Sequence, residues 1–183
     1  MSRIIAGVAG GRRLSMPAGD ATRPTADRAR EGLFSTLTSL RGNLDGASFL
    51  DLYAGSGAVG LEAASRGASR VLLVERDPEA LRAARANIDA LGLAGVELRA
   101  DPVERVLAAD PGAPFDVVFA DPPYAEPVDP TIDRLAAGGW LASDAVVVVE
   151  RASRDREPAW PATIEALRSR RYGEATLWYG RRP

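Results

Sequence analysis

Short apolar segments alternate with segments of helical periodicity from residue 48 onward, and this alternation constrains the fold more than any other feature of the chain. The strand candidates are Ser48–Tyr53, Arg70–Glu75, Val96–Arg99, Phe115–Ala120 and Ala145–Glu150. The helix candidates are Ala58–Arg66, Pro78–Leu91, Val103–Ala109 and Pro130–Ala137. Short, largely apolar strands are typical of a parallel sheet that is buried on both faces. The pattern therefore predicts an α/β fold with a mostly parallel sheet and helices on both of its faces.

The C-terminal part departs from this alternation. We expect a helix near Thr163–Arg171, followed by two strand-like pieces, Tyr172–Ala175 and Leu177–Gly180. These two pieces would form an antiparallel edge of the sheet.

The N-terminal part also departs from it. Arg3–Ala6 and Arg12–Met16 indicate a small hairpin around Gly7–Gly11, and an apolar stripe predicts a helix from about Asp27 to Leu40. We expect residues 1–41 to be an extension packed on a core of residues 42–183, and the two together to form a single compact domain.

Composition excludes several kinds of chemistry. The chain has no cysteine and no histidine, which removes thiolate nucleophiles, the usual general base and the commonest metal ligand. A hydrolase triad and a zinc site are therefore not expected, and a reaction that depends mainly on positioning fits better. No apolar run approaches the roughly 20 residues of a membrane span, and the N-terminus lacks the apolar stretch of a secretion signal. We expect a cytoplasmic protein without a membrane partner.

Positive charge gathers at the two ends of the chain. Residues 1–41 carry seven arginines against three acids, and residues 165–183 carry five arginines against two, although the net charge of the whole chain is −2. Such clusters suit either phosphate binding or a solvated surface, and charge alone does not separate the two. If they bind RNA, the candidates for phosphate contacts are Arg12, Arg13, Arg170 and Arg171.

The strand candidate Phe115–Ala120 leads directly into Asp121, Pro122, Pro123 and Tyr124. A carboxylate, a rigid turn of backbone carbonyls and a flat aromatic ring suit the planar exocyclic amine of a nucleobase. The lone pair of such an amine is delocalised into the ring. Acceptors on its two N–H bonds, Asp121 Oδ and the Pro122 carbonyl, would aim that lone pair at an electrophile while Tyr124 stacks on the base. The alternative is a proline turn that merely ends a strand.

A glycine-rich loop follows the first strand of the core. Gly55, Gly57 and Gly60 are spaced as in a dinucleotide-binding fingerprint, and Glu75 ends the next strand, where a ribose ligand belongs. Asp51 lies just before this loop, where it would repel a pyrophosphate but would suit the positively charged amino-acid part of S-adenosylmethionine. This favours S-adenosylmethionine over NAD(P).

Acids lie at the C-terminal ends of four successive strand candidates: Asp51, Glu75, Asp101 and Asp121. Because ligands bind at the carboxyl ends of parallel strands, these acids are expected to line one crevice. The alternative is helix capping and solvated turns, which is plausible for any one of them and less so for all four.

Several segments together resemble the RsmD-type bacterial 16S rRNA guanine-N2 methyltransferases. They are RIIAGVAGGRRL, RPTADRAREGLF, DLYAGSGAVGLEAASRGA, VERD and DPPY, and they span nearly the whole chain. The resemblance implies a class I S-adenosylmethionine-dependent methyltransferase (Rossmann-like) fold, with a seven-stranded sheet and an N-terminal extension. It implies methyl transfer to N2 of one specific guanine of 16S rRNA, guanine 966 in that family, on the assembled small subunit. It also implies a monomer.

The same resemblance assigns site residues. The cofactor set is Asp51, Ala54, Gly55, Ser56, Gly57, Glu75, Arg76, Asp101, Arg30 and Phe34. Within this set, Asp51, Gly55 and Gly57 would hold the methionine part, Glu75 the ribose and Asp101 the adenine. Arg30 and Phe34, together with Glu31, belong to an upstream motif that closes over the cofactor.

The base would lie on Asp121–Tyr124, which are the catalytic residues. Pro102 directly follows Asp101 and has no N–H to offer the adenine ring, so adenine would depend on Asp101 and on stacking.

Three alternatives stay open at this point. The first is an amino-methyltransferase of adenine N6 or of another amine in DNA or RNA, because DPPY suits any planar exocyclic amine. The second is an NAD(P)-dependent oxidoreductase, in which Asp51 and DPPY would have no role. The third is a non-catalytic RNA-binding module that keeps the fold, although the intact set of acids argues against it.

Overall fold

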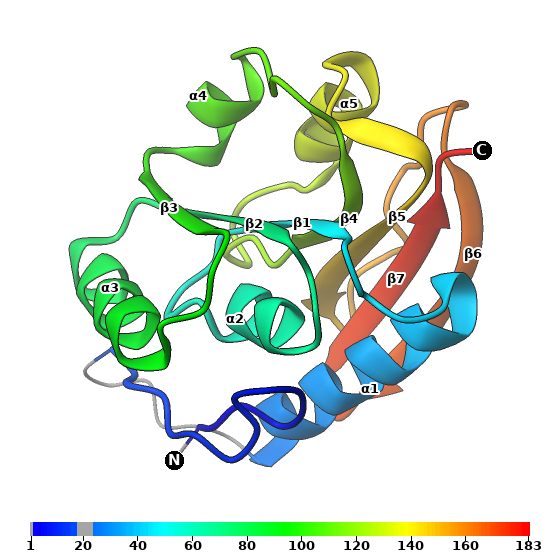
Figure 1. Ribbon diagram of the computed structural model, residues 1–183. Helices are drawn as coiled ribbons and strands as arrows, with labels where there is room; N and C mark the ends of the chain where they lie inside the picture. The colour runs from blue at the N-terminus through cyan, green and yellow to red at the C-terminus, as the bar shows by residue number, and fades with distance from the viewer. Residues whose placement is uncertain (1, 18–23) are drawn as a thin grey trace.

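A computed structural model describes residues 2–17 and 24–183 of the chain (Figure 1). Its centre is a seven-stranded sheet with the strand order β3-β2-β1-β4-β5-β7-β6. The strands are β1 (Ser48–Leu52), β2 (Arg70–Glu75), β3 (Val96–Ala100), β4 (Phe115–Ala120), β5 (Leu141–Ala152), β6 (Glu165–Tyr172) and β7 (Ala175–Arg181). Strands β1 to β5 pair in parallel, and β7 pairs antiparallel with both β5 and β6. The predicted mostly parallel α/β sheet is confirmed.

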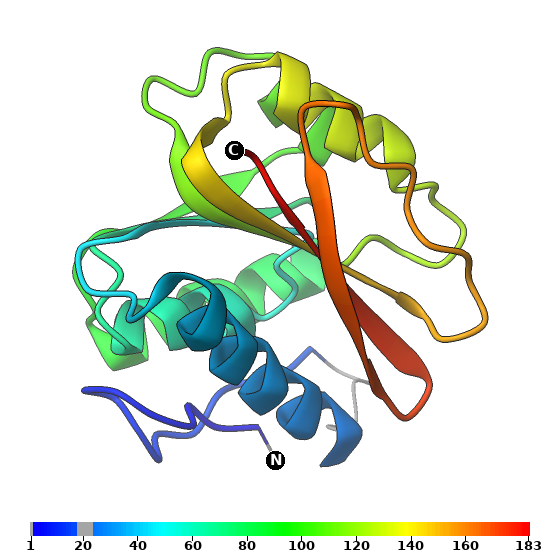
Figure 2. The same ribbon diagram turned by 90° about the vertical axis from the view of Figure 1, so that its right-hand side faces the viewer.

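Helices cover both faces of the sheet. They are α1 (Pro24–Arg41), α2 (Ala58–Ser65), α3 (Pro78–Leu91), α4 (Val103–Leu107) and α5 (Asp129–Ala137). Helices α1, α2 and α3 lie on one face, and α4 and α5 lie on the other, as Figure 2 shows from the β6–β7 edge. Each face has its own cluster of buried apolar side chains. No helix in residues 2–17 and 24–183 is both long and apolar enough to cross a membrane.

The N-terminal segment is tied to the helices beneath the sheet. The predicted hairpin is present as a bridge between Arg3 and Arg13. The buried carboxylate of Glu62 on α2 accepts from the backbone N–H groups of Ile5 and Ala6, at 2.7 and 2.9 Å. Asn87 of α3 accepts from Ser15 N–H at 2.7 Å. Because α1 contributes Leu33, Phe34 and Leu37 to the same apolar cluster as the sheet, residues 2–17, α1 and the sheet pack as one unit.

Two predicted elements near the C-terminus are wrong. The helix expected near Thr163–Arg171 is strand β6, and the expected strand Tyr172–Ala175 spans a turn at residues 173–174, with Tyr172 ending β6 and Ala175 beginning β7. Glu, Ala, Leu and Arg favour a helix locally, but the segment has no apolar stripe to bury. Strand pairing with β7 decides the outcome, and the arginines of β6 suit an exposed sheet edge.

Asp20 and Arg23, which were counted among the charges of residues 1–41, lie outside the described residues. Arg23 is also the first residue of the RPTADRAREGLF segment.

Candidate active site

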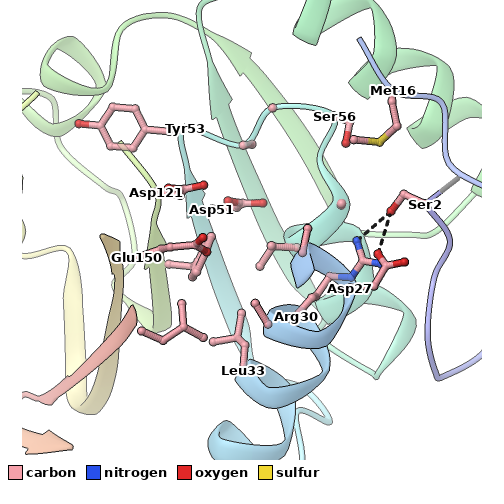
Figure 3. A pocket seen from close by; sticks show the side chains of 18 of the residues that line it. Ser2, Met16, Asp27, Arg30, Leu33, Asp51, Tyr53, Ser56, Asp121 and Glu150 are labelled. Atoms are coloured by element: carbon pink, nitrogen blue, oxygen red, sulfur yellow. Dashed lines mark hydrogen bonds and ion pairs between the residues drawn. The ribbon is translucent and has the colours of Figure 1, made fainter. Parts of the chain in front are cut away.

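Two adjoining cavities open at the carboxyl ends of the parallel strands. The first, of about 400 Å³, extends toward α1 and the N-terminal segment, and the second, of about 610 Å³, extends toward β2 and β3. Four residues line both cavities: Tyr53, Asp121, Tyr124 and Glu150. Because they share these four residues, the cavities form one crevice; Figure 3 shows the side chains that line the first of them.

The glycine-rich loop is fixed by hydrogen bonds to two acids. Gly55 N–H donates to Glu75 Oε2 and Gly60 N–H donates to Asp51 Oδ2, both at 2.8 Å. Gly57 N–H donates to the Ala54 carbonyl at 2.8 Å, and Gly57 has φ +81° at the start of α2. These three N–H groups are already paired within the protein, so they are not free to cradle a pyrophosphate as an NAD(P) site requires.

Gly55 leaves room for a ligand. It has φ +58° and lines the first cavity, and a Cβ built on it would meet no protein atom within 4 Å. A ligand can therefore approach the backbone here without meeting a side chain.

Asp51 lies at the end of β1 and is 1% exposed. Burial, together with the nearby Asp121 and Glu75, raises the pKa of Asp51 to about 8, against the hydrogen bond from Gly60. A cation placed in the first cavity would favour the ionised form of this carboxyl. The electrostatics therefore suit the sulfonium and ammonium groups of S-adenosylmethionine.

The second cavity holds the residues predicted for the ribose and adenine. Glu75 Oε1 accepts from the N–H groups of Arg76 and Asp77, at 2.7 and 2.8 Å. Arg76 pairs with Glu126, and Asp101 pairs with Arg105 at 3.0 Å. Glu75, Arg76 and Asp101 all line this cavity.

All four residues of the DPPY segment line the second cavity, together with Glu75 and Asp101. Tyr124 is 70% exposed, which leaves its ring open to a base. Arg151 of β5, which lines neither of the two cavities, holds the DPPY segment in place. Its guanidinium donates to the carbonyls of Tyr124 and Glu126 at 3.2 and 3.1 Å.

Asp121 and Glu150 lie next to each other. In the β4–β5 register, Ala120 pairs with Val149, so the following residues on the two strands are neighbours. Figure 3 shows both side chains at the same cavity, with Asp51 nearby. Asp121 is exposed toward the cavity, yet the protein around its carboxyl displaces enough water to raise its pKa to about 6, against the effect of Arg151. Burial and the charge of Asp121 raise the pKa of Glu150 to about 8.

Arg30 and Phe34, which were both predicted to contact the cofactor, differ in their access to the crevice. Arg30 lines the first cavity, but its guanidinium is buried and is already bonded to Ser2 Oγ, the Arg3 carbonyl and Asp27. Phe34 lines neither cavity; it is 1% exposed and stacks on Phe49 with ring centroids 6.1 Å apart. Phe34 therefore acts in packing, and the expectation that it contacts the cofactor is not supported by its position. Glu31 is exposed on α1.

The four arginines predicted to contact RNA are not equivalent. Arg12 donates to the carbonyls of Ala90 and Leu91 at the end of α3, so it has a structural partner. Arg171 lines a small cavity beside Tyr124, together with Arg154. Arg13 and Arg170 are exposed.

Sequence reasoning missed Glu150, Tyr53 and Glu62. Glu150 carried the same signal as the four acids that were found, because it closes the strand candidate Ala145–Glu150. Tyr53 adopts φ +61° and bonds Thr131 Oγ1 at 3.0 Å, and nothing in its local sequence indicates this. Glu62 is 0% exposed in α2 and pairs with Arg66.

Comparison with known proteins places this geometry in a family. The profile of the family described as Conserved hypothetical protein 95 matches residues 2–181. The chain belongs to this family. It is 36% identical over 173 residues to the ribosomal RNA small subunit methyltransferase D of Escherichia coli, covering 94% of this chain and 85% of that protein. It is 35% identical to the putative rRNA methyltransferase YlbH of Bacillus subtilis, covering 90% and 89%.

Solved structures agree. The putative methyltransferase yhhF from Escherichia coli superposes with a TM-score of 0.87 at 35% identity, over 99% of this chain and 97% of that one. The predicted resemblance to RsmD-type enzymes and the class I methyltransferase fold are confirmed.

Proposed function

We propose that this protein transfers a methyl group from S-adenosylmethionine to N2 of one guanine in 16S rRNA of the small ribosomal subunit, guanine 966 in the numbering used for this family. One observation carries the proposal: the DPPY segment and the glycine loop fixed by Asp51 and Glu75 line the same pair of adjoining cavities. Family membership and the names of the relatives support a substrate in small-subunit rRNA. We expect the protein to act in the cytoplasm, as a monomer, on the assembled subunit.

The residues of the crevice fit the cofactor. Asp51 and the Gly55 region would hold its methionine part, Glu75 its ribose and Asp101 its adenine, while Ala54, Ser56 and Arg76 complete the walls. Because Pro102 begins α4 and has no N–H, Asp101 is the polar group expected to meet the adenine. When bound, S-adenosylmethionine supplies an electrophilic methyl group on a cationic sulfur.

The protein's own residues position the target amine. Asp121 Oδ and the Pro122 carbonyl would accept hydrogen bonds from the two N2–H groups, so that the lone pair of N2 points toward the glycine loop. Tyr124 would hold the base by stacking after it leaves its own stack. Positioning the amine against the methyl group supplies most of the rate enhancement. Methylation makes the remaining N2 protons acidic, and Asp121 accepts one of them only after that step. This chemistry needs no histidine.

The test is methyl transfer from labelled S-adenosylmethionine to small subunits from a strain that lacks the gene, followed by nucleoside analysis of the rRNA. We expect one N2-methylguanosine per subunit. Subunits from the parent strain, which are already methylated, serve as the control and should take up no label. N6-methyladenosine as the product would replace the proposal with the adenine alternative, and no label despite saturating cofactor would contradict it.

A further inference from the structure

Asp121 and the Pro122 carbonyl do not explain how an enzyme of this kind tells guanine from adenine. Both bases carry an exocyclic amine next to ring atom N1. In guanine, N1 carries a hydrogen and donates; in adenine, N1 is a lone-pair acceptor. A residue beside Asp121 that faces N1 could therefore separate the two bases.

Glu150 lies beside Asp121. It is the strand neighbour of Asp121, it lines both cavities together with Asp121 and Tyr124, and its side chain lies at the cavity in Figure 3. Within residues 2–17 and 24–183, its carboxylate accepts no hydrogen bond, unlike those of Asp51 and Glu75. The half-buried carboxylate is therefore open to a donor that a ligand brings into the cavity.

We propose that Glu150 accepts the N1–H of the target base and so selects guanine over adenine. The proposal rests on the proposed function, because it assumes that Asp121 holds the amine. A guanine edge brings N–H donors to both carboxylates at once. Adenine would instead bring a ring nitrogen lone pair against the Glu150 oxygen, which is repulsive.

The protonation state of Glu150 is the point on which the inference depends. A protonated carboxyl would donate to N1 of adenine and reverse the selection. Burial and Asp121 favour the protonated form in the free protein. In the complex, the N1–H donor of guanine and the cationic methyl donor in the same crevice both favour the ionised form of Glu150.

2-Aminopurine is the probe that isolates N1–H. It has the same amine as guanine, but its N1 is an acceptor. Small subunits would be reconstituted with 16S rRNA that carries either guanine or 2-aminopurine at the target position. Transfer rates would be measured at saturating S-adenosylmethionine for the wild type and for Glu150→Gln. The Gln amide can accept from or donate to N1, so it should tolerate both bases.

We expect the wild type to prefer guanine by about 100-fold, as for a lost hydrogen bond to a charged group plus an unpaired carboxylate. In Glu150→Gln, the preference should fall by about 10-fold or more. The missing O6 of 2-aminopurine affects both proteins equally and cancels in this comparison. Glu150→Asp, which keeps the carboxylate, should keep most of the preference.

The matched control is Glu165→Gln, the same chemical change at the exposed far end of β6, which should leave the preference unchanged. A wild type that methylates guanine and 2-aminopurine equally, or a Glu150→Gln variant with the wild-type preference, would overturn the role of Glu150 alone. A wild type that forms no N2-methylguanosine would instead overturn the proposed function.

Discussion

On the β1–β3 side of the crevice, each acid at a strand end makes a hydrogen bond or an ion pair within the protein. On the β4–β5 side, the two acids at the strand ends accept no hydrogen bond from the described residues. Asp51 and Glu75 accept backbone N–H groups of the glycine loop, and Asp101 pairs with Arg105. In the described part of the chain, the carboxylates of Asp121 and Glu150 accept no hydrogen bond. Under the proposed function, the cofactor half (Asp51, Glu75 and Asp101) is built in advance, and the base half (Asp121 to Tyr124 with Glu150) is completed only when the substrate arrives.

The two halves also differ in what holds their backbone. Acids inside the cofactor half fix the glycine loop, while Arg151, from outside the cavity, fixes the DPPY segment through two carbonyls. Asp121 is thus left free to act on the ligand. Mutations should therefore separate cofactor binding from methyl transfer.

Loss of the stacking ring should give a large effect in the base half. We expect Tyr124→Ala to lower kcat/KM for the small subunit by about 10- to 100-fold, the range for one lost base–aromatic stack. The side chain is 70% exposed, so folding and S-adenosylmethionine affinity should not change. Tyr124→Phe keeps the ring and serves as the control. If Tyr124→Phe is as slow as Tyr124→Ala, the hydroxyl rather than stacking is responsible.

Crowding the cofactor half should weaken cofactor binding. A Cβ on Gly60 would overlap Leu73 Cδ2 and lie 3.2 Å from Asp51 Oδ2. Gly60→Ala should push α2 away from β2 and raise the S-adenosylmethionine Kd by about 10-fold, which calorimetry would measure. Leu73→Val removes the overlapping atom, so the double variant should recover part of the affinity. Affinity that stays at the wild-type value in Gly60→Ala would show that the loop is not held rigidly.

Asp51, which accepts a hydrogen bond from the glycine loop, should lower the stability of the folded protein as the pH rises. The pKa of Asp51 is raised to about 8 when folded, so between about pH 4 and pH 8 the folded state holds a proton that the unfolded chain has lost. Stability of the cofactor-free protein should therefore fall through this window. Asp51→Asn should match the wild-type Tm near pH 4 or below and exceed it by a growing margin up to pH 8, reaching about 10 °C, at about 1.4 kcal/mol per pH unit and roughly 2–4 °C per kcal/mol.

Exposed Asp89→Asn is the control for this experiment and should leave the pH dependence of Tm unchanged. A Tm difference between Asp51→Asn and wild type that stays constant with pH would contradict a raised pKa at Asp51. Cofactor affinity of Asp51→Asn should fall at the same time, because the site loses the charge that meets the cofactor's cation.

The smallest effect is expected at the rim of the base half. Arg171, beside Tyr124, should contact one phosphate, so Arg171→Gln should weaken subunit binding a few-fold at about 0.15 M salt and reduce the salt slope by about one. Arg82→Gln, an exposed arginine on α3, is the control. An unchanged salt slope in Arg171→Gln would remove this residue from the RNA surface.

Much of the fold and of the cofactor half could be predicted from the sequence, because the strand-end acids and the glycine loop are local sequence features. Strand-end acids and glycines need only the alternation of elements and the rule that ligands bind at the carboxyl ends of parallel strands. The misread segment β6 shows the limit: its residues favour a helix, and only pairing with β7 makes it a strand. The role of Phe34 depended on how α1 packs against Phe49 of β1, and the position of Glu150 beside Asp121 depended on the pairing of β4 with β5, neither of which the order of the chain states.

The most direct measurement compares Asp121→Ala with Glu75→Ala, recording S-adenosylmethionine Kd by calorimetry and single-turnover methyl transfer to small subunits at saturating cofactor. We predict that Asp121→Ala slows transfer by about 1000-fold or more, as expected when an orienting acceptor is lost, with Kd within about threefold of the wild type. We predict that Glu75→Ala raises Kd by at least about 10-fold and changes the saturated rate much less. If both variants change the same quantity to the same degree, the crevice does not consist of a prebuilt cofactor half and a substrate-completed base half.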